Sequence, residues 1–263
     1  MKELFVSYPY LFVFVMAFFN WFMTFLGSTI VFFIKKESQK LVSIALGSAA
    51  GIMVAASFFS LILPAINELD NKPTYFLLII PLGFLLGGLF LRLCDLLLPH
   101  EHLISHHQEG LKDSHLSKTN LLMLAMTLHN IPEGLAVGVA FAGNGQQLLS
   151  AIILSIGIGI QNFPEGMAIS LPMHQCGISK SKSLFYGQLS ALVEIPSALI
   201  GYSFAKMMGT ILPFALSFAA GAMIFVCIEE LIPEANATKE IDVGTMSFMV
   251  GFIIMMTLDI CLG

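Results

Sequence analysis

The sequence predicts an all-α polytopic membrane protein with eight transmembrane helices, on the basis of composition and of the length and spacing of its apolar stretches. Of its 263 residues, 57% are hydrophobic and only 11% are charged, and the mean hydropathy is +0.87. Soluble domains average about 25% charged residues, roughly twice this fraction. The connectors between apolar stretches are short, so we expect residues 1–263 to form a single transmembrane domain.

Eight apolar windows are long enough to cross a bilayer, whose ~30 Å hydrocarbon core needs about 20 helical residues. They are 10–34, 41–66, 74–98, 119–141, 147–171, 184–205, 211–233 and 243–262. The first window exceeds the ~7–15 residues of a signal-peptide core, so we interpret it as a retained helix.

The distribution of basic residues predicts the orientation in the membrane. Eight crossings place both termini on one side, and cytoplasmic segments are enriched in Lys and Arg. With the termini outside, the cytoplasmic side holds Lys35, Lys36, Lys40, Arg92, Lys112, Lys118, Lys180, Lys182 and Lys239. The external side keeps only Lys2, Lys72 and Lys206. We therefore expect an integral protein of the cell (inner) membrane with extracytoplasmic termini. We expect it to contact the lipid bilayer and to bind no nucleic acid.

The longest connector, 99–118, is cytoplasmic in this scheme and reads "PHEHLISHHQEGLKDSHLSK". It contains five of the seven histidines: His100, His102, His106, His107 and His115. Short histidine-rich tracts indicate metal binding by composition. Two interpretations stay open here, a weak and mobile metal-binding segment or a solvated loop that is merely rich in histidine.

Acidic residues occur in the interior of three predicted helices. "HNIPEGLA" at 129–136 and "QNFPEGMA" at 161–168 place Glu133 and Glu165 inside windows four and five, and "VEIPSA" at 193–198 adds Glu194. No Lys or Arg lies in the interior of any predicted helix. An unpaired buried charge costs several kcal/mol, so protons or bound cations must neutralise these carboxylates. Ionisable groups at this depth indicate function.

The two repeated motifs place further polar side chains beside their glutamates. His129 and Glu133 are four residues apart and share one helix face, and Gln161 and Glu165 repeat the arrangement. His129 and Gln161 each lie ~15 Å from the predicted inner end of their helix, so the two pairs are expected to meet near the midplane. Imidazole, carboxylate and amide oxygens suit divalent metals.

Each motif also contains a proline. Pro132 and Pro164 lack the N–H group that would bond the carbonyls of Leu128 and Ile160, and their rings bend the helix. Such backbone is tolerated at membrane depth where it lines a cavity or is satisfied locally. Broken helices in matching positions indicate a transporter substrate site. We therefore expect the Pro-kinked fourth and fifth helices to form a midplane metal site.

These residues resemble the signatures of the ZIP family (Zrt/Irt-like proteins) of divalent-metal transporters, and the length resembles that of its bacterial members. The second window, "ALGSAAGIMVAASFFSLILPA" at 45–65, and "EELIPEA" at 229–235 are also similar to this family. The resemblance covers essentially the whole chain. It implies a secondary transporter that imports Zn²⁺ into the cytoplasm by alternating access, as a homodimer.

The resemblance also implies a binuclear metal centre in which Glu133 and Glu165 bridge two ions. One ion would be bound by His129, Glu133, Gln161 and Glu165. The other would be bound by Asn130, Glu133, Asn162, Glu165 and Glu194. Many members have histidine at the position of Gln161, and some have aspartate at that of Asn162. The amide weakens affinity for zinc-like ions, so Fe²⁺, Mn²⁺ and Cd²⁺ are further expected cargoes.

Two other sets of residues have two interpretations each. Acidic residues near inner helix ends form either an interfacial rim or a metal exit route: Asp95, Glu229, Glu230 and Glu234. Side chains on the second predicted helix either line the metal path or pack between helices: Met53, Ser57 and Ser60.

Alternative functions are an intramembrane metal-dependent hydrolase and a metal-selective channel or sensor. The chain lacks HExxH, GxSxG and a second histidine inside a predicted helix, since His174 lies at a helix end. Those features are typical of metal-dependent and serine hydrolases. We therefore expect no enzymatic activity and no catalytic residues.

Overall fold

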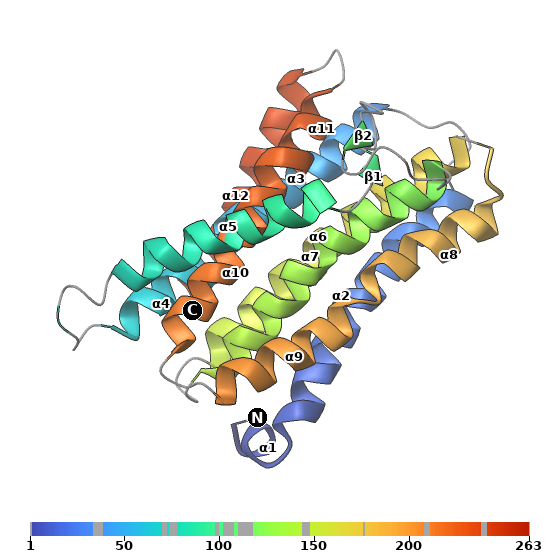
Figure 1. Cartoon of the computed structure of the whole chain (residues 1–263). Helices are drawn as coiled ribbons and strands as arrows, with labels where there is room; N and C mark the ends of the chain where they lie inside the picture. Colours follow the sequence, from blue (N-terminus) through green and yellow to red (C-terminus); the bar gives the residue numbers. More distant parts are fainter. Residues whose placement is uncertain are drawn as a thin grey trace.

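The computed structural model describes residues 2–33, 39–69, 73, 78–97, 100–101, 108–109, 118–143, 148–175, 177–207, 211–237 and 241–262. Almost all of them are helical (Figure 1). In the histidine-rich connector the described backbone is a two-residue antiparallel strand pair, β1 (His100–Glu101) with β2 (Gln108–Glu109). The five histidine side chains of this connector lie outside the described residues, so both interpretations of it stay predictions.

The helices follow the predicted windows in order. They are α1 (Lys2–Ser7), α2 (Pro9–Thr29), α3 (Gln39–Ala56), α4 (Leu63–Asn67), α5 (Ile79–Leu97), α6 (Lys118–Ala142), α7 (Leu148–Gln175), α8 (Lys180–Ala191), α9 (Glu194–Met207), α10 (Leu212–Val226), α11 (Ile232–Asn236) and α12 (Ile241–Leu262). A 3₁₀ turn, Ile30–Phe32, extends α2. Both α6 and α7 continue through their prolines.

Six segments of the described chain are long and apolar enough to cross a membrane. They are Pro9–Phe32, Lys40–Asn67, Leu148–Leu171, Lys180–Met207, Leu212–Asn236 and Asp242–Cys261. The other two windows contain α5, with a shorter apolar stretch at Ile79–Cys94, and the 25-residue α6. An all-α polytopic fold is thus confirmed, while the count of eight crossings stays a prediction.

Three of the windows are not uniform helices. π-helical stretches at Ser57–Ile62 and Cys227–Leu231 join α3 to α4 and α10 to α11, each just before a proline, Pro64 or Pro233. Window 184–205, predicted as one helix, is interrupted at residues 192–193, between α8 and α9. Proline removes the hydrogen bond to the fourth residue back and crowds its carbonyl, so the chain adjusts on the N-terminal side of each proline.

The long helices form two groups, which lie side by side in Figure 1. We call α2, α6, α7, α8 and α9 the motif group, because it carries both repeated motifs. We call α3, α4, α5, α10, α11 and α12 the flanking group. In the motif group the main pairs are α2 with α7 and α6 with α9; in the flanking group they are α3 with α12 and α5 with α10. The groups meet chiefly where α3 packs on α7 and α10 packs on α6.

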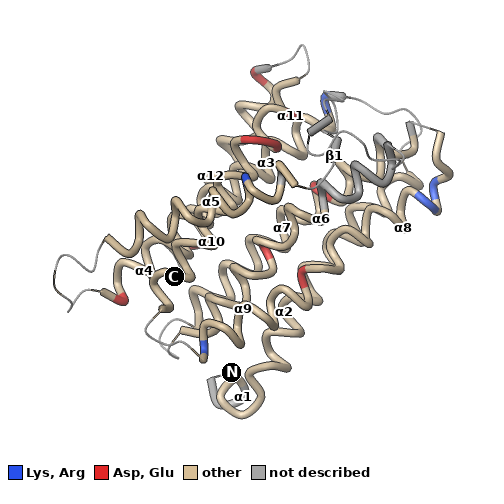
Figure 2. Tube along the Cα trace, in the orientation of Figure 1, with Lys and Arg blue, Asp and Glu red and all other residues tan. Residues whose placement is uncertain are grey.

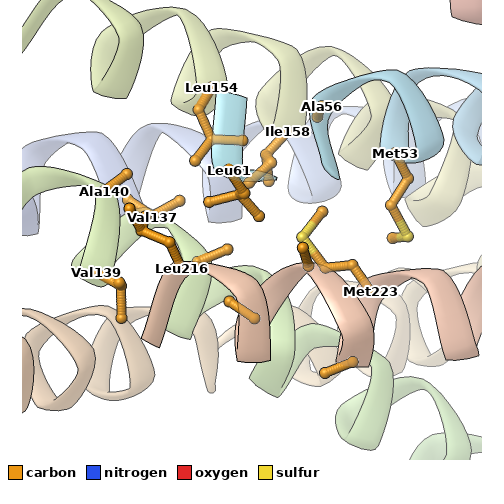
Figure 3. Packing of buried hydrophobic residues seen from close by; sticks show 14 of the residues in the cluster. Met53, Ala56, Leu61, Val137, Val139, Ala140, Leu154, Ile158, Leu216 and Met223 are labelled. Atoms are coloured by element: carbon orange, nitrogen blue, oxygen red, sulfur yellow. The ribbon is translucent and has the colours of Figure 1, made fainter. Parts of the chain in front are cut away.

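An aliphatic core lies between the two groups (Figure 3). The motif group contributes Val137 and Ala140 from α6 and Leu154 and Ile158 from α7. The flanking group contributes Met53, Ala56, Leu61, Leu216 and Met223. Figure 2 shows acidic segments midway along the helices of the motif group. The described basic residues of this group lie at helix ends, at the starts of α6 and α8 and at the end of α9. The charged interior is therefore acidic.

Candidate metal centre

All seven predicted ligands are buried and lie on three helices of the motif group. His129, Asn130 and Glu133 lie on α6, Gln161, Asn162 and Glu165 on α7, and Glu194 begins α9. Five of the seven are 0% exposed; His129 and Glu165 are 4% and 3% exposed. Such burial of carboxylates is rare unless a partner compensates for their lost hydration.

The two repeated motifs meet through a glutamate and an amide. Gln161 Nε2 donates a hydrogen bond to Glu133 Oε1 over 2.6 Å. The other oxygens of this pair, Glu133 Oε2 and Gln161 Oε1, are buried and accept no hydrogen bond from the described residues. Each side chain of this hydrogen-bonded pair thus keeps one buried acceptor atom without a donor among the described residues, and a cation would stabilise both.

A second amide–carboxylate pair joins α7 to α9. Asn162 Nδ2 donates to Glu194 Oε1 over 2.8 Å and to the main-chain oxygen of Asn20, on α2, over 3.3 Å. Asn162 Oδ1 and Glu194 Oε2 are likewise buried and without a hydrogen-bond partner among the described residues. The two donor bonds orient the Asn162 amide and leave its oxygen available as a ligand.

The glycine of the first motif explains how α9 comes so close to α6. A Cβ atom at Gly134 would lie 2.5 Å from the carbonyl oxygen of Glu194 and 2.8 Å from the Cβ of Ser197. Real Cβ atoms essentially never approach backbone so closely, so the contact requires glycine. The motif residue Gly134 therefore brings Glu194 beside Glu133.

The three glutamates form one electrostatic cluster. Glu133 interacts electrostatically with both Glu165 and Glu194, and Glu165 interacts with His129. Across the described residues, no three His, Cys, Asp or Glu side chains already stand as a metal-binding group. Glu133 and Glu194 instead contact amides, and a bound ion would use the oxygens of these two pairs that accept no hydrogen bond from the described residues.

Glu230, in the π-helical stretch Cys227–Leu231, lies beside the predicted centre. Its Oε1 atom lies 3.5 Å from His129 Nε2, and this contact crosses from the flanking group to the motif group. Glu230 and Glu234 are 6% and 3% exposed, so both carboxylates are buried among the helices, and the two interpretations of this acidic set stay predictions. Glu229 is half-buried, and the side chain of Asp95 lies outside the described residues. The sequence could not place Glu230 beside His129, because only the fold brings window seven to window four.

The three residues of the second window make contacts within or between helices, and both interpretations of them stay predictions. Met53 belongs to the aliphatic core, and Ser57 Oγ donates to the Met53 carbonyl over 2.8 Å within its own helix, as packing residues do. Ser60 Oγ donates instead to Asp259 Oδ1 of α12 over 2.8 Å. Sequence analysis missed Asp259, although a single acidic residue inside the apolar window 243–262 could have indicated it.

The helical architecture and the buried centre define an integral membrane protein with an acidic, amide-lined interior. The family model described as ZIP zinc transporter matches residues 98–259. The chain is 38% identical over 242 residues to zinc transporter GufA of Myxococcus xanthus, covering 90% of this chain and 94% of that protein. It is 33% identical over 329 residues to human zinc transporter ZIP11, covering 94% and 96%. It is 35% identical over 243 residues to zinc transporter ZIPB of Bordetella bronchiseptica, covering 91% and 78%. This chain belongs to the ZIP family.

Proposed function

We propose that this protein imports divalent transition-metal cations, with Zn²⁺ as the principal cargo, into the cytoplasm. The pairing of buried carboxylates with amides, rather than with Lys or Arg, supports this most directly. Membership in a family whose relatives are named zinc transporters supports the cargo. These relatives do not support the hydrolase alternative, since they are named as transporters and not as enzymes.

The proposed centre binds two ions. One ion takes His129, Glu133, Gln161 and Glu165, and the other takes Asn130, Glu133, Asn162, Glu165 and Glu194. The unpartnered oxygens of Glu133, Gln161, Asn162 and Glu194 supply ligand atoms at both positions. Two divalent ions bring four positive charges against three glutamates, which relieves the repulsion in the cluster.

Selectivity in this proposal depends on the unequal motif copies. His129 offers an imidazole nitrogen, whereas Gln161 at the matching position offers an amide oxygen. Nitrogen ligands suit Zn²⁺, and oxygen ligands suit harder ions such as Mn²⁺. We expect Fe²⁺, Mn²⁺ and Cd²⁺ to compete with Zn²⁺.

Glu230 gives the proposed cargo a way out of the centre. It contacts His129 from the flanking group, and Glu234 follows four residues later, one turn nearer the end of α11. With extracytoplasmic termini, that end faces the cytoplasm. An ion leaving His129 would therefore meet carboxylates on the cytoplasmic side.

Movement of the motif group against the flanking group would provide alternating access. Backbone-to-backbone glycine contacts hold each group together, while aliphatic side chains fill the boundary between them. We further propose that residues 1–263 act as one transporter domain in the inner membrane, with extracytoplasmic termini and as a homodimer. The exposed apolar side chains along α5 and α12 are consistent with lipid or a second copy.

The test is Zn²⁺ uptake into proteoliposomes that contain purified protein. Glu133→Ala removes the proposed bridging ligand and should abolish saturable uptake. Asp242→Asn, a change of an exposed carboxylate at the start of α12, is the matched control and should leave uptake normal. Near-normal uptake by Glu133→Ala would refute the proposed centre. Competition by Fe²⁺, Mn²⁺ and Cd²⁺ in the same assay measures selectivity.

A further inference from the structure

Trp21, the single tryptophan of the chain, makes an unusual contact in the motif group. Its indole Nε1–H donates to the main-chain oxygen of Gln188 over 3.1 Å and to Gln188 Oε1 over 3.0 Å. Tryptophan in membrane proteins is enriched at the lipid–water interface. Trp21 instead lies midway along the span Pro9–Phe32, ~17 Å from either end at 1.5 Å per residue.

The Gln188 carbonyl is available because the helix is interrupted just beyond it. In a regular α-helix this carbonyl would accept the N–H of Leu192. Leu192 N donates to Leu189 O instead, over 3.2 Å, and α8 ends at Ala191. The interruption continues to Glu194, where α9 begins, and Pro196 cannot supply an N–H to the carbonyl of Leu192. Trp21 thus satisfies an acceptor that the interruption exposes within the membrane.

The same turn of α2 also contacts Asn162, the hydrogen-bond partner of Glu194. The carbonyl of Asn20, the neighbour of Trp21, accepts the Asn162 Nδ2 group that also donates to Glu194 Oε1. Two adjacent residues of α2 therefore contact both sides of the interruption: Trp21 directly at Gln188, and Asn20 through Asn162 at Glu194. The α8–α9 junction has little freedom to move Glu194 without breaking one of these bonds.

We propose that Trp21 is a positioning residue for the metal centre: its indole N–H holds the α8–α9 interruption in the shape that places Glu194 beside Asn162. This proposal rests on the proposed function, because Glu194 and Asn162 are ligands of the second ion there. Trp21 touches no ion; it acts through the carbonyl of Gln188. The hydrogen bond should therefore matter for the ion that uses Glu194 and not for the ion that uses His129 and Gln161.

A double-mutant cycle measures this coupling. Zn²⁺ is titrated calorimetrically into purified wild type, Trp21→Phe, Glu194→Gln and the double variant. Trp21→Phe keeps an aromatic ring and removes the N–H. It should weaken Zn²⁺ binding roughly three- to tenfold, the equivalent of one buried hydrogen bond. The weakened step should be the one that Glu194→Gln also impairs. In the Glu194→Gln background the same change should have no further effect. Phe22→Leu, a change of the adjacent exposed aromatic, should match wild type.

The single tryptophan also provides a spectroscopic test without mutation at position 21. Incorporation of 5-fluorotryptophan labels Trp21 alone, and its ¹⁹F resonance should shift on Zn²⁺ addition in wild type but not in Glu194→Gln. If Trp21→Phe does not fold, Gln188→Met replaces it in the cycle; it removes one of the two acceptors and should give a smaller effect on the same step.

Three results would overturn the proposal. They are a wild-type Zn²⁺ affinity in Trp21→Phe, additive effects of the two substitutions on that affinity, and a ¹⁹F resonance that does not shift when Zn²⁺ is added. Each is distinguishable from failure of the proposed function. If Glu133→Ala still imports Zn²⁺, the metal centre itself is wrong. If Glu133→Ala is inactive and the cycle is additive, the proposed metal centre is retained and only the proposed role of Trp21 is rejected.

Discussion

Helix contacts inside each group differ in kind from contacts between the two groups. Inside the motif group, a Cβ at Gly138 would meet the main chain of Ala198 and Tyr202; inside the flanking group, one at Gly51 would meet that of Phe248. At the boundary, a Cβ at Gly157 of α7 would meet only side-chain atoms, the thioether of Met255 and a methyl of Ile52. Backbone in contact with backbone resists sliding, whereas flexible side chains can repack. Each group is therefore suited to move as a unit.

The groups also differ chemically. The motif group contains all seven proposed ligands, whereas the flanking group places the carboxylate of Glu230 beside His129. A site borne mainly by one group can move with it, while contacts across the boundary change. The following predictions test this difference, from the largest expected effect to the smallest.

A crosslink across the boundary should stop transport completely. In a variant without native cysteines, Gly157→Cys is combined with Ile52→Cys, because a Cβ at position 157 lies 3.9 Å from Ile52 Cγ2. Oxidation should abolish Zn²⁺ uptake in proteoliposomes, and reduction should restore it, since the motif group can no longer move.

The control for this crosslink lies within one group. Gly47→Cys with Ser247→Cys joins α3 to α12, where a Cβ at position 47 would lie 3.2 Å from Ser247 Cβ. A Cβ at position 47 would also lie 2.5 Å from the carbonyl oxygen of Gly244, so this variant is compared with its own reduced form, and oxidation should cause no further loss of uptake. Full uptake by the oxidised 52–157 variant would show that the groups do not move against each other at this point.

Alanine substitution should separate the two kinds of contact by stability. Gly138→Ala places a methyl group 2.7 Å from the backbone nitrogen of Tyr202, so it should lower the free energy of unfolding by about 1–3 kcal/mol through overpacking. Gly157→Ala, its matched control, displaces the flexible end of Met255 and should cost less than ~1 kcal/mol. The melting temperature of each variant in the same detergent measures the difference. Equal losses would contradict the distinction.

The contact that crosses between the groups should affect transport more than binding. Glu230→Gln keeps the shape of the side chain and removes its charge, so uptake should fall roughly tenfold, within the range expected when a bond to a charged group is lost. Zn²⁺ stoichiometry should stay at the wild-type value, because Glu230 is not among the seven proposed ligands. Loss of a bound ion in calorimetry would instead make Glu230 a resident ligand.

Acidification should weaken Zn²⁺ binding by the motif group. His129 must be neutral and the glutamates ionised to bind metal, so protons compete with the cargo. Affinity should fall several-fold between about pH 7.5 and pH 5.5, the interval around the ordinary histidine titration. Calorimetric titrations at both pH values check this. An unchanged affinity would count against His129 as a ligand.

Several features of the centre were predictable from local sequence alone. Helical period places His129 and Glu133 on one face, and the repeated motif does the same for Gln161 and Glu165. The burial of all four agrees with that expectation. Apolar length likewise predicted helical windows, six of which the structure supports as spans. The helical fold was confirmed, whereas the assignment of these residues as ligands stays a prediction that rests on side-chain direction in a helix.

Other features depend on contacts between distant segments. Spacing could not predict the hydrogen bond between Gln161 and Glu133 or the one between Ser60 and Asp259. It also could not predict that Glu230 would lie beside His129. The interruption between α8 and α9 was also missed, although Pro196 marked the place, because many helices in membranes pass through proline unbroken. In this chain α6 and α7 do so at Pro132 and Pro164.

By itself the sequence determined the class of protein, most of its helices and the two repeated motifs that carry the proposed ligands, because composition and helical period are local properties. Only the tertiary structure decided which carboxylate meets which amide, and which glutamate of window seven approaches His129. Those pairings depend on how closely two helices approach, and that distance is set where glycines such as Gly134 allow backbone to contact backbone. The partner across such a contact is distant in the chain, so no local pattern reveals it.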